Sequence, residues 1–510
     1  MKKKMMAKIG ALALASMLAV PAFASCKDGS SLANTSIGNA DAEYALNIYV
    51  YEAGYGKGWI AKAAEEFCKK YPNYQVHITS DKGMFEKVRT ELDADKCEAD
   101  IALMSDVDYS MLASGGHLAD LTDIMNSELP ESDDLLKDVI PEAHVAYRQL
   151  GVGENAKWYG IPWQDNCANG IIYNKGFFEE HHLEIPETMD EYFQLCNDII
   201  DLNTGMYPLV YCGADDYMMN IPNQWLSEYY GYEYMTGTFH KYDNWKYYED
   251  TETGRQKAYD TLAKMLKGEY KGTPYAKPGS EALSADVAQT EFASYTPTAA
   301  MYICGPWFPT EEADFLDVLG DDFDYGYFGI PHINANKKDA FGKDSSNVRY
   351  SLPSNALVIP QTSQNKAGAK LFLLELYSNY SLSAFVEENN GISRPMTYTP
   401  EVSFDTTTKK GKFAQQVYDY FKGTADNPTQ LVYEISTAKM ASRLAPCNFG
   451  DISENIVTNI KNAASYSVAK SKVSGAADRE TDWVKTHWDD NATHPTDPNV
   501  KGYWNALYLR

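Results

Sequence analysis

Two tryptophans stand where apolar segments end, one of them beside polar residues, a combination suited to binding a flat molecule rich in hydroxyl groups. Trp307 follows the strand-like run 299–303, and Trp163 is followed directly by Gln164 and Asp165. An aromatic ring stacks on a face of C–H groups, while carboxylates and amides form paired hydrogen bonds with hydroxyls. These residues predict a ligand-binding site. The alternatives are a core tryptophan at 307 and hinge packing at 163 and 165.

Further candidates lie in loops or at the ends of predicted elements. Glu52 and Tyr55 follow the first predicted strand, and ligands of open α/β sheets collect beyond the carboxyl ends of strands. A plain surface loop is the alternative. The guanidinium of Arg394 could direct two N–H donors at neighbouring hydroxyls or at a carboxylate, or it could form a structural ion pair. The remaining candidates are two loop aspartates and a tryptophan that an amphipathic helix could bury instead: Asp106, Asp216 and Trp225.

The sequence contains no pattern that indicates a cofactor, a metal site or covalent catalysis. The glycines at 54, 56 and 58 lack the spacing of a dinucleotide- or phosphate-binding loop and predict a tight turn. The adjacent His181 and His182 would point to different sides of a helix. We therefore predict no catalytic residue, no metal and no cofactor. A secreted glycoside hydrolase is the alternative, since 71 acidic residues could always supply two carboxylates.

The N-terminus has the order of a secretory signal: lysines at 2, 3, 4 and 8, an apolar run over 9–20, then small residues up to Cys26. The sequence Phe23-Ala24-Ser25-Cys26 fits a lipobox, in which Cys26 is acylated and becomes the first residue. Cleavage before Ser25 by an ordinary signal peptidase is the alternative. We expect residues 1–25 to be the signal peptide and 26–43 to be a flexible tether, because the tether is polar and rich in Ser, Gly, Asn and Asp.

Charge and cysteine usage narrow the class of protein. Residues 1–25 hold four lysines and no acidic residue, so their loss changes the formal net charge from −26 to −30. Such an acidic chain repels phosphate backbones, which disfavours nucleic-acid binding. Seven cysteines remain beside Cys26, an odd number without a CxxC pair, and this argues against a disulfide scaffold. The mature length exceeds what one core usually holds, so we expect two domains.

The apolar pattern positions these candidates in an α/β protein. Alternating residues over 46–50 predict a strand, the stripe over 59–67 predicts a helix, and strands follow near 76–78 and 101–103. This alternation predicts a mostly parallel sheet covered by helices. Thr188-x-x-Glu191 predicts a capping box at the start of a later helix.

The order of motifs resembles that of the family 1 extracellular solute-binding proteins of ABC importers, which includes maltose-binding protein. The matching motifs are Tyr159-Gly160-Ile161-Pro162-Trp163, Gly170-Ile171-Ile172-Tyr173-Asn174-Lys175, Pro186-Glu187-Thr188-Met189-Asp190-Glu191-Tyr192, Ala300-Met301-Tyr302-Ile303-Cys304-Gly305-Pro306-Trp307 and Gly391-Ile392-Ser393-Arg394-Pro395. The resemblance runs from about residue 46 to 395. Residues 231–271 and the C-terminal tail have no counterpart in it.

The resemblance implies a two-lobed periplasmic-binding-protein-like fold of class II, with hinge strands between the lobes and the ligand cleft at their interface. The implied N-terminal lobe is 44–163 plus 302–357, and the C-terminal lobe is 164–301 plus 358–510. Hinges would then lie near Gln164, Met301 and Val358. The resemblance also implies that Trp307 and Trp225 stack on the ligand.

The function that the resemblance implies is capture of a carbohydrate, an oligosaccharide, and its delivery to the permease of an ABC importer. We expect an exported monomer held at the membrane through a lipid on Cys26. A receptor of the same fold for a solute other than a sugar is one alternative. A secreted glycan-active enzyme is another.

Overall fold

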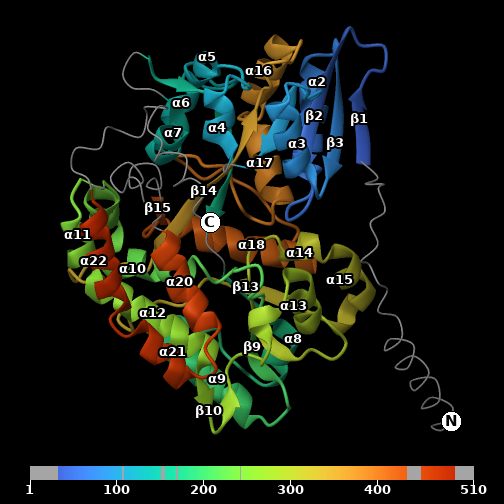
Figure 1. The fold of residues 1–510 in the computed structure, drawn as a ribbon. Helices are drawn as coiled ribbons and strands as arrows, with labels where there is room; N and C mark the ends of the chain where they lie inside the picture. Colours follow the sequence, from blue (N-terminus) through green and yellow to red (C-terminus); the bar gives the residue numbers. More distant parts are fainter. Residues whose placement is uncertain are drawn as a thin grey trace, which may run out of the picture.

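The computed structural model describes residues 33–105, 108–150, 155–167, 170–241, 243–433 and 450–488. They form two α/β lobes, each built on one main sheet with helices around it (Figure 1). The first lobe lies at the top of the figure and carries the blue N-terminal strands. The second lies below and carries the red C-terminal helices. The expected α/β class is confirmed.

The sheet of the first lobe is mixed. Within the described residues its strand order is β1-β3-β2-β4-β14-β15, and β7 also pairs with β14. β2 is parallel to β3 and β4, whereas β1, β7 and β14 add antiparallel pairs. The prediction of a mostly parallel sheet is therefore wrong, because β14 enters from the second sheet and runs antiparallel to both β4 and β7, and β1 runs antiparallel to β3. The flexible tether expected over 26–43 is wrong for residues 33–38, because these form β1 and pair with β3. The strands are β1 Ala33–Gly38, β2 Tyr44–Tyr51, β3 Tyr74–Asp81, β4 Ile101–Met104, β7 Gly160–Cys167, β14 Val348–Val358 and β15 Gln430–Tyr433.

Helix α2 shows how the sequence forms the first lobe. Its stripe of Trp59, Ile60, Ala63, Ala64 and Phe67 is buried against the sheet, as the spacing predicted. Two lysines occupy its last turn, where the helix dipole favours positive charge. The helices of this lobe are α2 Gly58–Lys70, α3 Met84–Asp93, α4 Tyr109–Ser114, α5 Thr122–Met125, α6 Leu136–Val139, α7 Glu142–Arg148, α16 Lys366–Glu375 and α17 Asn379–Glu388.

The second lobe contains a four-stranded sheet in the order β13-β8-β12-β9 among the described residues. Its strands are β8 Gly170–Asn174, β9 Tyr207–Tyr211, β12 Ala299–Cys304 and β13 Tyr325–Phe328. Its helices before the C-terminal region are α8 Lys175–Glu180, α9 Met189–Asp201, α10 Ile221–Gly237, α11 Lys246–Asp250, α12 Glu252–Lys267, α13 Ala285–Phe292, α14 Phe308–Glu311, α15 Ala313–Leu319 and α18 Lys409–Lys422. The capping box predicted at Thr188 and Glu191 is confirmed at the start of α9.

The C-terminal helices pack back onto the second lobe. They are α20 Gly450–Lys461, α21 Tyr466–Val473 and α22 Ala476–His487, and they lie along α11 and α12 (Figure 1). The two regions without a counterpart in the family motifs therefore contact each other. The buried ion pair between Arg255 and Glu480, at 2.6 Å, joins them.

Two segments lie in the other lobe from the one predicted. Part of 302–357 belongs to the second sheet, because β12 and β13 pair with β8. Part of 358–510 lies in the first lobe, because α16 and α17 pack on α2. The hinges predicted near Met301 and Val358 are wrong for the same reason: Met301 pairs with Leu209 inside the second sheet, and Val358 pairs with Ala102 inside the first. An apolar strand pattern looks alike in either lobe, so it could not assign these segments.

Candidate functional site

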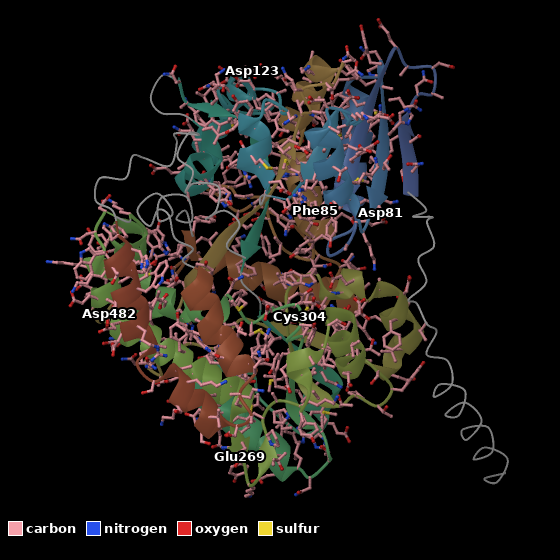
Figure 2. The ribbon with its side chains drawn as sticks, viewed as in Figure 1. Asp81, Phe85, Asp123, Glu269, Cys304 and Asp482 are labelled. Atoms are coloured by element: carbon pink, nitrogen blue, oxygen red, sulfur yellow. The ribbon has the colours of Figure 1, made fainter. Side chains whose placement is uncertain are left out.

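Four aromatic side chains meet where the two lobes face each other. The ring of Tyr55, after β2, lies 6.0 Å from that of Trp163 in β7 and 6.2 Å from that of Trp307, both edge-on. Tyr217, between β9 and α10, meets Trp307 edge-on at 5.4 Å. We call these four residues the aromatic cluster. Figure 2 labels Asp81 at the end of β3 and Cys304 at the end of β12, on the sides of the lobes that face one another.

The loop after β2 brings the first lobe against Trp307. Gly54 and Gly56 have φ values of +79° and +68°, and the N–H of Gly56 donates to the carbonyl oxygen of Glu52 at 3.0 Å, which confirms the tight turn. A Cβ atom at Gly54 would lie 3.7 Å from Cβ of Trp307. Trp307 itself is half-buried and directly precedes α14. The positive φ of the turn favours glycine here, while a Cβ atom would make only an ordinary contact with Trp307.

Polar atoms around the cluster are buried without partners. Within the described part of the chain, the indole nitrogens of Trp163 and Trp307, Oε1 of Gln164 and Oδ1 of Asp165 complete no hydrogen bond. Leaving such an atom unpaired costs about 1–3 kcal/mol, so native proteins usually pair it with protein, water or ligand. Both donors and acceptors are present, which suits a ligand whose hydroxyls can do either. β7 thus contributes three consecutive residues of this kind.

Arg394 supports the cluster from behind. It is 1% exposed and donates from Nη1 to the carbonyl oxygen of Trp163 at 3.1 Å. Its guanidinium lies 4.3 Å from the ring of Phe385 and 5.2 Å from that of Trp59. Burial lowers the pKa of Arg394 to about 10. Arg394 forms no ion pair with a described carboxylate, and its side chain holds the backbone beneath Trp163.

Glu52 and Asp216 are engaged with neighbouring residues. Glu52 accepts a hydrogen bond from Oγ of Ser80 at 2.8 Å and lies 3.7 Å from Nζ of Lys57. Asp216 pairs with Lys461 of α20 at 2.5 Å. Lys461 also donates to a backbone carbonyl of the second lobe at 2.7 Å, so Asp216 helps to attach the C-terminal helices.

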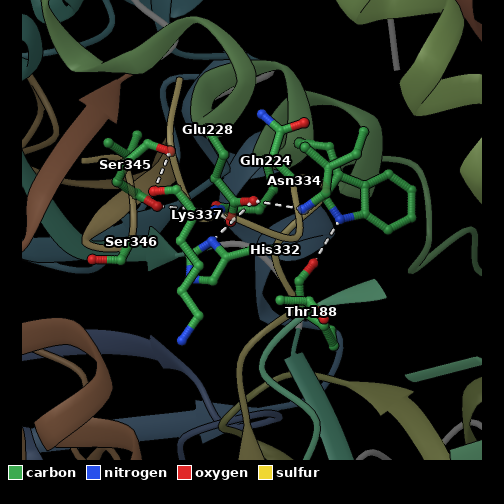
Figure 3. Close-up of polar contacts among 12 residues, drawn as sticks. Thr188, Gln224, Glu228, His332, Asn334, Lys337, Ser345 and Ser346 are labelled. Atoms are coloured by element: carbon green, nitrogen blue, oxygen red, sulfur yellow. Dashed lines mark hydrogen bonds and ion pairs between the residues drawn. The ribbon is translucent and has the colours of Figure 1, made fainter. Parts of the chain in front are cut away.

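Trp225 has no exposed surface and donates its indole N–H to the carbonyl oxygen of Pro331 at 3.0 Å. One turn later in α10, the buried Glu228 lies 3.2 Å from Nδ1 of His332 (Figure 3). Gln224 donates to Glu228 at 2.6 Å and to a backbone carbonyl of β14 at 3.0 Å. Trp225 therefore packs in the core, which is the alternative that an amphipathic helix offered. Its ring is not accessible to a ligand in this structure.

Two predicted residues lie outside the described part of the chain. They are the ligand candidate Asp106 and the lipidation candidate Cys26. Their roles stay predictions. Among the described residues, no group of three or more His, Cys, Asp or Glu side chains could hold a metal ion. No described helix has both the length and the apolar character needed to cross a membrane.

Sequence reasoning missed several residues next to the cluster. Tyr217 follows the candidate Asp216 directly and is the residue whose ring meets Trp307. Glu311 lies one helical turn after Trp307 and accepts a hydrogen bond from Nε2 of Gln289 at 2.8 Å. Burial raises the pKa of Glu311 and raises that of Glu312 to about 7. The spacing of four residues from Trp307 was the available signal for Glu311, since such residues share a helix face.

The comparisons with known proteins agree with this architecture. The family described as bacterial extracellular solute-binding protein matches residues 50–380, more than half of the chain. An uncharacterised ABC transporter extracellular-binding protein of Pyrococcus horikoshii is 26% identical over 148 residues, which are 28% of this chain and 31% of that protein. The match thus spans less than a third of the relative's length.

Solved structures resemble the whole fold at low sequence identity. RafE from Streptococcus pneumoniae, in its apo form, has a TM-score of 0.55 and 17% identity, covering 87% of this chain and 99% of RafE. Another RafE structure holds raffinose. The GacH receptor of Streptomyces glaucescens, solved unliganded and with acarbose, has a TM-score of 0.55 and 15% identity over 87% of this chain and 99% of GacH. These likenesses show the two-lobed fold of such receptors.

Proposed function

Because the chain belongs to the family of bacterial extracellular solute-binding proteins, we propose that it captures a carbohydrate, an oligosaccharide, between its lobes and delivers it to the permease of an ABC importer. The observation that carries this proposal is the aromatic cluster, whose rings come from both lobes and lie beside unpartnered polar atoms. Support also comes from RafE and GacH, whose structures hold raffinose and acarbose.

The proposed binding residues are those that the structure brings to the lobe boundary. Trp307, Trp163 and Tyr55 would stack on the sugar, while Asp165 would accept hydrogen bonds from its hydroxyls. A ligand that contacts both lobes favours a closed form of the protein over an open one, because it binds the closed form more tightly. A near-complete switch needs a difference in binding free energy of about 5.5 kcal/mol between the two forms. Glu52, Asp106 and Asp216 stay candidates for contact with the ligand. Trp225 and Arg394 act from the core in this proposal.

The chain is proposed to bind its ligand without cleaving it, and to act as a monomer attached to the membrane by a lipid on Cys26. The family and the structural neighbours are binding proteins. Chromatography of oligosaccharides after long incubation with the protein tests the absence of catalysis. Shorter sugars that accumulate with time would contradict it and favour a glycan-active enzyme.

The ligand class is tested by a thermal-shift screen over oligosaccharides, monosaccharides, peptides and polyamines. We expect oligosaccharides to raise the midpoint of unfolding most, because a ligand that binds only the folded state stabilises it. Stabilisation by peptides or polyamines alone would favour the alternative of a receptor for another solute.

The site is tested by Trp307→Ala, which should weaken oligosaccharide binding by at least ~1 kcal/mol, about fivefold, through loss of a stacking surface. Tyr295→Ala is the matched control, because Tyr295 is an aromatic residue of the same lobe, 62% exposed, whose hydroxyl donates to Val318 rather than to the cluster. Equal affinities of the wild type and a folded Trp307→Ala protein would remove Trp307 from the site.

A further inference from the structure

His144 is a buried histidine next to the proposed site that no sequence pattern pointed to. It lies in α7 and has no exposed surface. Its Nε2 atom is 3.4 Å from Oδ1 of Asp165, and its ring meets that of Tyr433 edge-on at 4.7 Å. Neither ring nitrogen completes a hydrogen bond with the described residues. A fully buried imidazole with two unpaired nitrogens is costly unless something else completes its contacts.

Asp165 is the side chain that His144 approaches. It is 4% exposed, and its backbone N–H donates to the carbonyl oxygen of Ser393 at 3.1 Å, which fixes the backbone of β7 at this point. Its Oδ1 atom is unpartnered, as are Oε1 of Gln164 and Nε1 of Trp163 in the two preceding residues. His144 thus lies next to the row of unpaired polar atoms that β7 places beside the aromatic cluster.

The chemistry of the pair follows from which atoms can donate. A carboxylate only accepts hydrogen bonds, whereas a neutral imidazole donates from one nitrogen and accepts at the other. Since Nε2 is the nitrogen near Asp165, it should carry the proton, and Nδ1 is then an acceptor. The separation of 3.4 Å is slightly long for an N–H···O bond, so a small shift would complete it.

We propose that His144 is a positioning residue of the carbohydrate site, which directs its Nε2–H at Oδ1 of Asp165 and orients that carboxylate to accept a hydrogen bond from a ligand hydroxyl. This inference rests on the proposed function. It adds a residue from the first lobe, on an element outside the family motifs, to the determinants of affinity. The ligand group that it selects is a neutral hydroxyl donor, because a ligand carboxylate at this place would face Asp165.

The binding arm of the test uses His144→Leu, His144→Gln and Asp165→Asn in the full chain. The probes are raffinose, acarbose, chitotriose, xylotriose and maltotriose, measured by isothermal titration calorimetry. We expect His144→Leu to weaken binding about tenfold or more, because a misoriented Asp165 would lose its hydrogen bond with the ligand hydroxyl. His144→Gln keeps an N–H donor and should restore most of the affinity. His144→Leu should cost little more in the Asp165→Asn background. Unchanged affinity in His144→Leu, or independent effects of the two substitutions, would overturn the proposal.

The second arm needs no ligand. Nitrogen-15 NMR of the histidine rings should show a proton on Nε2 of His144, and Asp165→Asn should shift the Nε2 resonance. A ring without a proton on Nε2 would overturn the proposal even if sugars bind. So would an Nε2 resonance that does not change in Asp165→Asn. If the wild type binds none of the five sugars, the proposed function fails, while the NMR result still decides whether His144 positions Asp165.

Discussion

Replacing Arg255 with methionine should loosen the C-terminal helices from the second lobe. Arg255 and Glu480 are 4% and 3% exposed, and Nη1 lies 2.6 Å from Oε2. The hydroxyl of Tyr259 donates to the same carboxylate oxygen at 3.0 Å, and Nη2 of Arg255 donates to the carbonyl oxygen of Tyr248 at 2.5 Å. Burial alone would lower the pKa of Arg255, but Glu480 together with Tyr259 and Tyr248 outweighs burial, and the pKa is raised. The guanidinium therefore stays charged, and its removal takes the positive charge away from the buried carboxylate of Glu480.

The expected loss of stability follows from breaking the buried ion pair between Arg255 and Glu480. Removing one partner of a buried ion pair costs about 3–5 kcal/mol, whereas replacing both partners with apolar residues is often close to neutral. Arg255→Met should lower the free energy of unfolding by the first amount, and Arg255→Met/Glu480→Leu should recover most of it. Arg479→Met is the matched control, because Arg479 is exposed and donates to two backbone carbonyls of the same region. Its cost should stay below ~1 kcal/mol.

The assay is urea unfolding followed in parallel by far-ultraviolet circular dichroism and tryptophan fluorescence, since a protein of two lobes need not unfold in one step. The transition of the second lobe should move to lower urea in Arg255→Met and return toward its original position in the double variant. The reasoning is refuted if Arg255→Met loses no more stability than Arg479→Met. It is also refuted if the double variant is no more stable than Arg255→Met.

Two other predictions concern titration and anchoring. Burial, then the charges of Asp286 and Glu311, raise the pKa of Glu312 from 4.5 to about 7, while the charge of Lys82 opposes the shift. The contribution of Glu312 to stability is therefore complete below about pH 4.5 and is lost as the pH rises through about 7. Glu312→Gln should make the midpoint of thermal unfolding less dependent on pH between 5 and 8, and an unchanged slope would contradict this. Cys26→Ser should move the protein from the membrane fraction to the medium or periplasm, whereas continued membrane attachment would argue against the lipid anchor.

Local structure could be read from the sequence where one pattern decided it. The buried stripe of α2, the capping box at Thr188 and the turn at Gly54 each depend on residues close together in the chain, and all three are confirmed. The assignment of strands to lobes could not be read in this way. The residues of β12 and β14 do not say which sheet each strand joins, and only their partners do: β8 and β9 for β12, and β4, β7 and β15 for β14.

The candidate site was predictable in part for a similar reason. Tyr55 and Trp307 follow the ends of β2 and β12, and both meet at the lobe boundary, where Trp163 joins Tyr55 from within β7. Trp225 gave the same signal of an aromatic residue beside amides, but α10 turns it into the core. Glu311 offered only its spacing from Trp307, and His144 gave no signal, because the place of each depends on how α14 and α7 pack on distant strands.

The described residues of the regions without family counterparts pack against β14 and β15, on the strand that enters the first lobe from the second. Tyr248 of α11 and Val484 of α22 share an apolar cluster with Val348 of β14 and Val432 of β15. The chain passes from the second sheet to the first between β13 and β14. Gln224 of α10 donates a hydrogen bond to the carbonyl oxygen of Val348, at the start of β14. None of these residues belongs to the aromatic cluster. The added helices therefore stiffen the second lobe where it meets β14, and this is the end of β14 that must adjust if the lobes move relative to each other.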